Sequence, residues 1–168
     1  MGNPNVGKSV VFNRLTGARA IESNYPGTTV DYLEGTVSIG GEPVRIVDVP
    51  GTFSLRTRDK AEEISARMLE ENPDAIVISV IDTTRIERGL YLTLEIAERG
   101  NPMIVVLNMW DVASREGMTV DLSALGGILG TKVIVTSAIS GEGILELREA
   151  IPSAKRINPT SVMEEVRS

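Results

Sequence analysis

The chain has 168 residues, 42% of them hydrophobic and 24% charged, which fits one globular domain with a full core. Its net charge of −6 argues against a nucleic-acid partner, because such a surface needs a basic patch. The absence of cysteine and histidine excludes disulfides, thiolate metal sites, thiol nucleophiles and the commonest general base, and no apolar run approaches the ~18 residues of a bilayer span.

The first motif, residues 2–9, reads GNPNVGKS and fits the phosphate-binding pattern G-x-x-x-x-G-K-[ST]. In such a loop the backbone N–H groups point at the α- and β-phosphates, Lys8 reaches the β- and γ-phosphates, and the Ser9 hydroxyl ligates Mg²⁺. The predicted nucleotide contacts here are Asn3, Pro4, Asn5, Val6, Gly7, Lys8 and Ser9. A buried strand normally precedes this loop. Only Met1 does so here, and we therefore expect further apolar residues upstream in the natural protein.

Residues 10–17 are predicted to form a helix that ends at Gly17, with its N-terminal dipole facing the phosphates. Residues 24–31, which read NYPGTTVD, are expected to form a loop. One of its threonine hydroxyls is a candidate to complete the Mg²⁺ shell, and we favour Thr29 over Thr28. The alternative is a β-turn at Pro26-Gly27 followed by the start of a strand, and both interpretations can hold together.

Two β-branched runs, residues 35–41 and 43–49, meet at Gly40-Gly41-Glu42 and predict an antiparallel hairpin. The second run leads into a D-x-x-G element, residues 48–51. Alone this element would more often be a plain turn. After a phosphate-binding loop, we expect Asp48 to hold Mg²⁺ through a water and the Gly51 N–H to bond the γ-phosphate, so that hydrolysis releases the segment behind it.

Farther along, apolar strands alternate with amphipathic helices. Strands are predicted over residues 75–82, 103–108 and 133–137, and helices over 86–99, 122–129 and 144–151. This alternation predicts an α/β fold, and the phosphate-binding motif with the D-x-x-G element indicates that it is of the P-loop GTPase type. Its sheet is mostly parallel with one antiparallel edge strand, helices cover both faces, and ligands bind at the carboxyl ends of the strands.

Two strand ends carry residues that would select the base. Asn108, Met109 and Asp111 form an N-x-x-D element, in which the Asp111 carboxylate accepts from guanine N1–H and the 2-amino group, a donor pair that adenine lacks. Met109 stands where lysine is usual and supplies apolar contact without charge. Ser137 and Ala138 fit the element whose backbone N–H reaches guanine O6. Each motif alone is weak, since strand-end turns look alike.

Together these residues resemble the GTPase (G) domain of the FeoB family, prokaryotic ferrous-iron transport proteins in which a cytosolic G domain precedes a polytopic membrane region. The most particular matches are DVPGTFSL at residues 48–55 and RIERGLYLTL at residues 85–94, beside the motifs at 2–9, 24–31 and 108–111. The resemblance implies a G domain over residues 1–152. Residues 153–168 would then be a linker or the truncated start of a following helical domain.

The resemblance also implies that Asn5 helps to bind a potassium ion beside the phosphates, where other GTPases use an arginine finger. The alternative is that Asn5 merely caps the loop. Ras-like enzymes carry glutamine after the D-x-x-G element, whereas this chain has Thr52, so we expect slow hydrolysis. The predicted catalytic groups are Lys8, Asn5, Thr29 and Gly51. Three further candidates, Arg56, Arg58 and Arg85, are expected to lie on solvated surface.

The implied function is slow, Mg²⁺-dependent GTP hydrolysis to GDP in the switch domain of a membrane iron transporter, at the cytoplasmic face of the cell membrane. The partners are then guanine nucleotide and the transporter region of the same natural polypeptide, with no nucleic acid; association of identical copies stays open. One alternative is a GTP/GDP-binding regulatory module with negligible hydrolysis. Another is a free-standing GTPase of ribosome assembly or tRNA modification, which the acidity and the LYLTL match disfavour.

Overall fold

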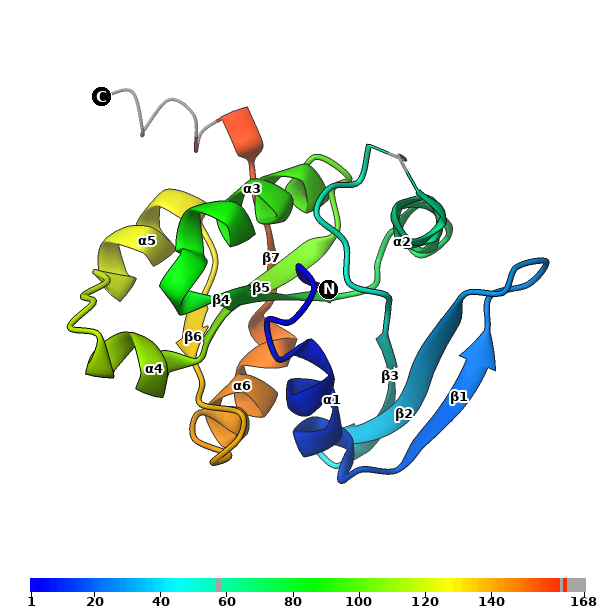
Figure 1. Ribbon diagram of the computed structural model, residues 1–168, viewed down its shortest axis with the longest axis horizontal. Helices are drawn as coiled ribbons and strands as arrows, with labels where there is room; N and C mark the ends of the chain where they lie inside the picture. The colour runs from blue at the N-terminus through cyan, green and yellow to red at the C-terminus, as the bar shows by residue number, and fades with distance from the viewer. Residues whose placement is uncertain (57–58, 161, 163–168) are drawn as a thin grey trace.

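The computed structural model describes residues 1–56, 59–160 and 162. Its elements in chain order are α1 (Lys8–Thr16), β1 (Ala20–Asn24), β2 (Asp31–Ile39), β3 (Glu42–Asp48), α2 (Lys60–Glu71), β4 (Val77–Asp82), η1 (Thr83–Arg85), α3 (Ile86–Ala97), β5 (Pro102–Asn108), α4 (Trp110–Arg115), α5 (Leu122–Leu129), β6 (Val133–Val135), α6 (Ile144–Ala150), η2 (Ile151–Ser153) and β7 (Lys155–Arg156). Figure 1 shows β4, β5 and β6 among the helices, and β1, β2 and β3 at the right-hand side of the molecule.

The strands form two sheets. β1, β2 and β3 are antiparallel neighbours, so the antiparallel part is larger than the single edge strand expected from the sequence. β4, β5 and β6 run parallel, and β7 pairs antiparallel with the first two residues of β5. The carboxyl ends of β4, β5 and β6 therefore lie at one edge, where an open α/β sheet binds its ligands.

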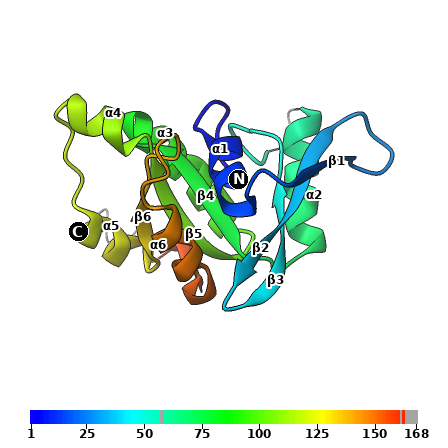
Figure 2. The same cartoon turned by 90° about the horizontal axis from the view of Figure 1, so that it is seen from below.

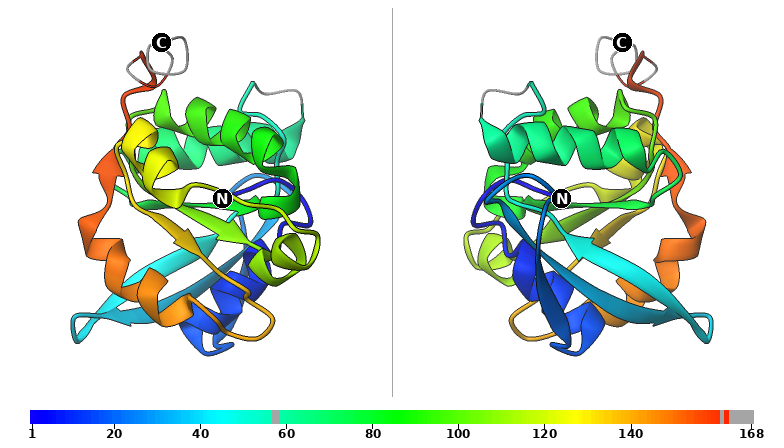
Figure 3. Two further views of the ribbon diagram at one scale, coloured as in Figure 1. Left: turned by 90° about the vertical axis from the view of Figure 1, so that its left-hand side faces the viewer. Right: turned by 90° about the vertical axis from the view of Figure 1, so that its right-hand side faces the viewer.

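Helices cover both faces of the parallel sheet, as predicted. Along β5, Met103, Val105 and Leu107 pack into one apolar cluster with α2, α3 and α5, while Ile104 and Val106 pack into a second cluster with α1 and α6. Alternate residues of a strand point to opposite faces, so a continuous apolar strand fills both clusters. Figure 3 shows α2, α3 and α5 on one side and α1 and α6 on the other.

Residues 1 and 2 lie between the two sheets. The Met1 carbonyl accepts from the Val80 N–H at 2.8 Å, and the Gly2 carbonyl accepts from the Thr52 N–H at 3.2 Å. A Cβ on Gly2 would lie 2.4 Å from the Val80 carbonyl oxygen, so only glycine allows this approach. The chain thus enters the loop of residues 2–9 beside β4 and beside the segment that follows β3.

Among the α-helices and strands of the described residues, β1, α2, α4 and β7 were not predicted, and neither were the short 3-10 helices η1 and η2. Beyond residue 152, β7 pairs with β5, and Ile157 and Val162 are buried in the cluster beneath α3. Within the described part of the chain, no helix is both long and apolar enough to cross a bilayer.

Candidate nucleotide-binding site

The loop of residues 2–9, hereafter the phosphate loop, curls into the N-terminus of α1. Asn5 and Gly7 have left-handed backbone, with φ of 66° and 83°, immediately before the helix begins at Lys8. The N-cap Gly7 makes no side-chain capping hydrogen bond, so no side chain of the cap competes for the first N–H groups of α1. A helix N-terminus of this kind favours anions.

Lys8 and Ser9 meet at one carboxylate. The Lys8 ammonium is ion-paired with Asp48 Oδ1, and the Ser9 hydroxyl donates to Asp48 Oδ2 at 2.6 Å. The Asp48 side chain is 4% exposed, so this contact is largely shielded from water. A hydroxyl and a carboxylate are the oxygen ligands that suit Mg²⁺, which usually takes its remaining ligands from phosphate and water. The residues present therefore fit the predicted metal.

The D-x-x-G segment lies against the phosphate loop. A Cβ on Gly51 would come within 3.0 Å of Pro4 Cα, so the absence of a side chain permits the contact. The buried Asn3 amide donates to the Thr52 carbonyl at 3.1 Å. The structure thus brings Gly51 beside the loop that would hold the phosphates; its bond to the γ-phosphate stays a prediction.

The buried side chain of Asn108, at the end of β5, joins two loops. Its Nδ2 donates to the Val6 carbonyl at 2.9 Å, and its Oδ1 accepts from Thr136 Oγ1 at 2.9 Å and from the Ala138 N–H at 3.0 Å. A Cβ on Gly7 would lie 2.3 Å from the same Nδ2. Asn108 therefore holds the phosphate loop and the loop after β6 together. The sequence motif had suggested only a contact to the base.

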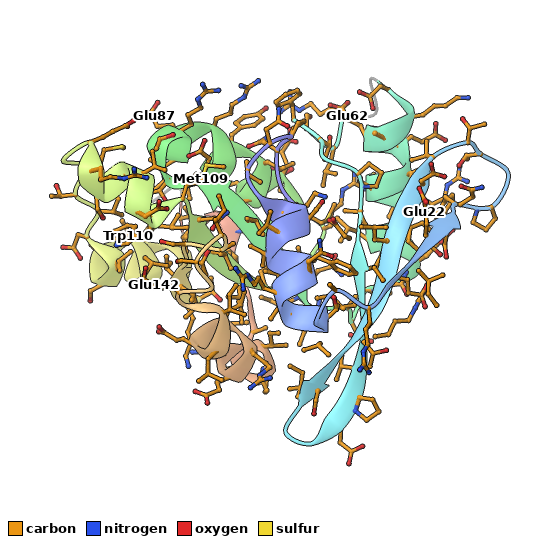
Figure 4. All side chains as sticks on the ribbon, turned by 60° about the horizontal axis from the view of Figure 1, so that its bottom comes forward. Glu22, Glu62, Glu87, Met109, Trp110 and Glu142 are labelled. Atoms are coloured by element: carbon orange, nitrogen blue, oxygen red, sulfur yellow. The ribbon has the colours of Figure 1, made fainter. Side chains whose placement is uncertain are left out.

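The residues predicted to select the base lie at the start of α4 and in the adjacent loop after β6. Met109 has left-handed backbone with φ of 61°, and the Asp111 N–H donates to Ser137 Oγ at 3.2 Å. Figure 4 shows Met109 and Trp110 close to the loop that carries Glu142. The Asp111 carboxylate is 52% exposed, with Arg115 Nη2 at 2.9 Å. It is therefore accessible to a ligand.

Thr29 is not brought to this site. The loop of residues 25–30 lies at the end of the β1–β2 pair, away from α1 (Figures 1 and 2), and Tyr25 Oη donates to Glu71 of α2 at 2.8 Å. Burial, and then the hydrogen bond to Glu71, raise the pKa of Tyr25 above its usual 10.0. The Thr28 hydroxyl is engaged within the turn, where it donates to the Tyr25 carbonyl. Thr29 is exposed in this loop, and because the loop lies away from α1, the predicted metal contact of Thr29 requires the loop to move.

A buried glutamate that the sequence did not single out clamps the segment after the D-x-x-G element. Glu95 of α3 accepts from the Leu55 N–H at 2.8 Å, from Ser54 Oγ at 3.2 Å and from Arg56 Nε at 3.0 Å. The Arg56 side chain is 66% exposed, and Arg85 is also exposed. Arg58 lies outside the described residues.

At one edge of this fold the phosphate loop, the D-x-x-G segment and the N-x-x-D turn meet, which is the arrangement of the P-loop GTPase class. The chain belongs to the FeoB family, because the family model described as "Ferrous iron transport protein B" matches residues 1–151.

Three known proteins illustrate the similarity. The Fe(2+) transporter FeoB of Escherichia coli (strain K12) is 40% identical over 159 residues, which cover 92% of this chain and 21% of that protein. The cytosolic domain of L. pneumophila FeoB superposes with a TM-score of 0.89 at 37% identity, over 94% of this chain and 63% of that one. The cytosolic domain of T. maritima FeoB in its GMPPNP form gives 0.84 at 40% identity, over 90% and 60%.

The chain thus spans about a fifth of the length of the E. coli relative, as its 21% coverage shows. The similarity to the solved structures extends over nearly all of this chain, so it supports the fold as a whole as well as the phosphate loop.

Proposed function

We propose that the chain binds GTP and GDP with Mg²⁺ and hydrolyses GTP slowly, as the switch domain of a ferrous-iron transporter. The observation that carries the proposal is the position of Asn108, which ties the phosphate loop at Val6 to the loop after β6 at Ala138. One nucleotide lying across this tie would contact both loops. The T. maritima relative in its GMPPNP form supports this, since GMPPNP is an analogue of GTP.

At the phosphate end, Lys8 and the backbone N–H groups of the phosphate loop hold the β- and γ-phosphates. Ser9 and Asp48 already lie 2.6 Å apart and would hold Mg²⁺, with Thr29 completing the shell once its loop moves inward. When bound, Mg²⁺ neutralises charge on the β- and γ-phosphate oxygens. The loop of residues 25–30 would then report whether GTP or GDP is present, since only GTP offers a γ-phosphate.

At the base end, the Asp111 carboxylate accepts hydrogen bonds from guanine N1–H and the 2-amino group, and Met109 packs on the ring. Ser137 Oγ accepts from the Asp111 N–H, and a backbone N–H of the loop at Ala138 donates to guanine O6. Adenine would leave the Asp111 charge unpaired, which costs binding free energy.

Hydrolysis requires a water to attack the γ-phosphorus while the bond to the β–γ bridging oxygen breaks, giving GDP and phosphate. Lys8 and the Gly51 N–H stabilise the charge that develops on the phosphate oxygens. Asn5 is exposed, and within the described chain its side chain makes no hydrogen bond, so it is accessible to a potassium ion that adds positive charge there.

Thr52 is 2% exposed and its hydroxyl donates to the Ser54 carbonyl at 2.5 Å, so it does not orient the water. Turnover is therefore slow.

The buried Thr52 hydroxyl also favours a second candidate function, a GTP/GDP-responsive binding module with negligible hydrolysis. In both cases the partner is the membrane region of the same natural polypeptide, and the domain lies at the cytoplasmic face of the membrane. The FeoB names of the relatives and the 63% coverage of the L. pneumophila cytosolic domain support this placement.

The base assignment is tested by nucleotide affinity. We expect GTP to bind far more tightly than ATP, and Asp111→Asn to lose about 100-fold in GTP affinity while gaining affinity for XTP, whose 2-oxo group matches a carboxamide donor. Asp74→Asn is the matched control, since the Asp74 side chain is 93% exposed and pairs with Arg156 of β7, away from Asp111. Equal binding of ATP and GTP by the unaltered protein would refute the guanine site.

Single-turnover assays separate hydrolysis from binding alone. We expect phosphate release from saturating GTP to be faster in KCl than in NaCl, and Asn5→Ala to remove that difference while GDP affinity is retained. Equal rates in both salts would remove the potassium role of Asn5. No phosphate release at all would identify the binding module.

A further inference from the structure

Arg14 of α1 binds the loop of residues 137–141, hereafter the base loop. Its Nε donates to the Ala138 carbonyl at 2.9 Å, and its Nη2 donates to the Ile139 carbonyl. The guanidinium therefore grips two consecutive peptide units of the loop predicted to read O6. A planar fork of donors suits this two-point contact, and lysine cannot reproduce it.

Because a peptide unit is planar, a hydrogen bond that fixes its carbonyl also fixes the direction of its N–H. The chain has no cis peptide bond among the described residues, so the N–H of Ile139 points opposite to the Ala138 carbonyl and away from Arg14. The neighbouring Ser140 N–H donates to the Ser137 carbonyl at 3.0 Å, and the Ala138 N–H donates to Asn108. In the described part of the chain, the Ile139 N–H has no such partner. It is a donor left for an external acceptor.

The same helix carries both ends of the site. α1 begins at Lys8 beside the phosphates, and Arg14 lies about 9 Å farther along its axis, since a helix rises about 1.5 Å per residue. The base loop is thus fastened twice, to the phosphate loop through Asn108 and to α1 through Arg14.

We propose that Arg14 is a positioning residue for the base. It fixes the base loop so that its backbone donors stay against the O6 of a 6-oxopurine, and it thereby slows release of the nucleotide. This inference rests on the proposed guanine site and goes beyond the motif residues, since Arg14 belongs to none of the nucleotide motifs.

The test is the dissociation rate of three bound diphosphates: GDP, inosine diphosphate and the diphosphate of 2-aminopurine riboside. The first two carry O6 and the third does not. We expect Arg14→Gln to speed release of GDP and inosine diphosphate about tenfold, from the loss of charge-assisted hydrogen bonds, and to leave the third nearly unchanged. Arg14→Lys, which keeps the charge without the fork, should recover only part of the effect.

Arg148→Gln is the matched control. Arg148 lines the same cavity of about 290 Å³ as Arg14, but within the described chain it makes no hydrogen bond to the base loop. It should leave all three rates unchanged.

Two results would overturn the inference while leaving the guanine site intact: unchanged GDP release in Arg14→Gln, or equal acceleration of all three nucleotides, which would indicate general loosening. Arg14→Lys gives the same comparison if the glutamine variant folds poorly. If the unaltered protein releases GDP no more slowly than ADP, the proposed guanine site itself fails, and this inference with it.

Discussion

Gly7 shows how single residues determine the shape of this site. It combines a left-handed backbone with a close approach to Asn108, where a Cβ would lie only 2.3 Å from Nδ2. Gly17 at the other end of α1 has φ of 67°, but a Cβ there would meet nothing within 4 Å. A side chain added at Gly17 would therefore destabilise the fold only through backbone conformation, whereas one added at Gly7 would also clash with Asn108.

We expect Gly17→Ala to destabilise the protein by about 1 kcal/mol, the usual cost of a left-handed alanine. Gly7→Ala should cost about 2 kcal/mol more, because the added methyl displaces the amide that joins the phosphate loop to the base loop. Denaturant unfolding measures both changes, and GDP affinity should fall only for Gly7→Ala. Equal losses of stability in the two variants would contradict the contact with Asn108.

At the scale of elements, Glu95 determines how α3 holds the segment after the D-x-x-G motif. Its carboxylate accepts a backbone N–H at Leu55 and lies within a residue that is 8% exposed. The ion pair with Arg56 adds little, because the Arg56 side chain is 66% exposed to solvent. The backbone contact, which is shielded from water, therefore carries most of the effect.

We expect Glu95→Gln to weaken this anchor by about 1 kcal/mol, since an amide oxygen accepts the Leu55 N–H less strongly than a carboxylate does. Amide hydrogen exchange at Leu55 should then lose about fivefold in protection. Glu98→Gln is the control: it removes the same charge from an exposed position at the end of α3. An unchanged Leu55 amide would show that the segment is held by other contacts.

The sequence predicted most elements, and the exceptions have separate physical causes. The signal for α2 was present: Asp59 caps the helix by accepting from the Glu62 N–H at 2.8 Å, and Ile64 and Leu69 recur on the buried face. β1 had no signal, because none of its residues is buried and it exists only by pairing with β2. Its strand character comes from the partner.

The site residues likewise fall into two groups, those that the sequence singled out and those that it did not. The motif residues Lys8, Ser9 and Asp48 could be singled out from sequence because each motif is local, and the fold brings the three side chains together. Arg14 and Glu95 could not be found from sequence, because their partners lie far along the chain, at Ala138 and Leu55 respectively. No periodicity or motif encodes contacts of that separation.

At the scale of the whole molecule, the proposed nucleotide joins two sheets, and among the described residues no strand of one sheet pairs with a strand of the other. Asp48 ends β3 of the antiparallel sheet and Gly51 follows it, whereas Asn108 ends β5 of the parallel sheet and the base loop follows β6. Between the sheets, Met1 and Gly2 supply the connecting backbone hydrogen bonds to Val80 and Thr52. A ligand that binds both sides should therefore stabilise the fold as a unit.

We expect GDP with Mg²⁺ at 100 times its Kd to add about 2.7 kcal/mol, and so to raise the melting temperature by about 5–10 °C for a domain of this size. ADP with Mg²⁺ should give no comparable shift. Removal of Mg²⁺ by a chelator should reduce the effect of GDP, because Ser9 and Asp48 would hold the ion and the ion would neutralise charge on the phosphates. If GDP moved the midpoint of only one of two separate transitions, the nucleotide would be stabilising one sheet alone, and the bridging geometry would be wrong.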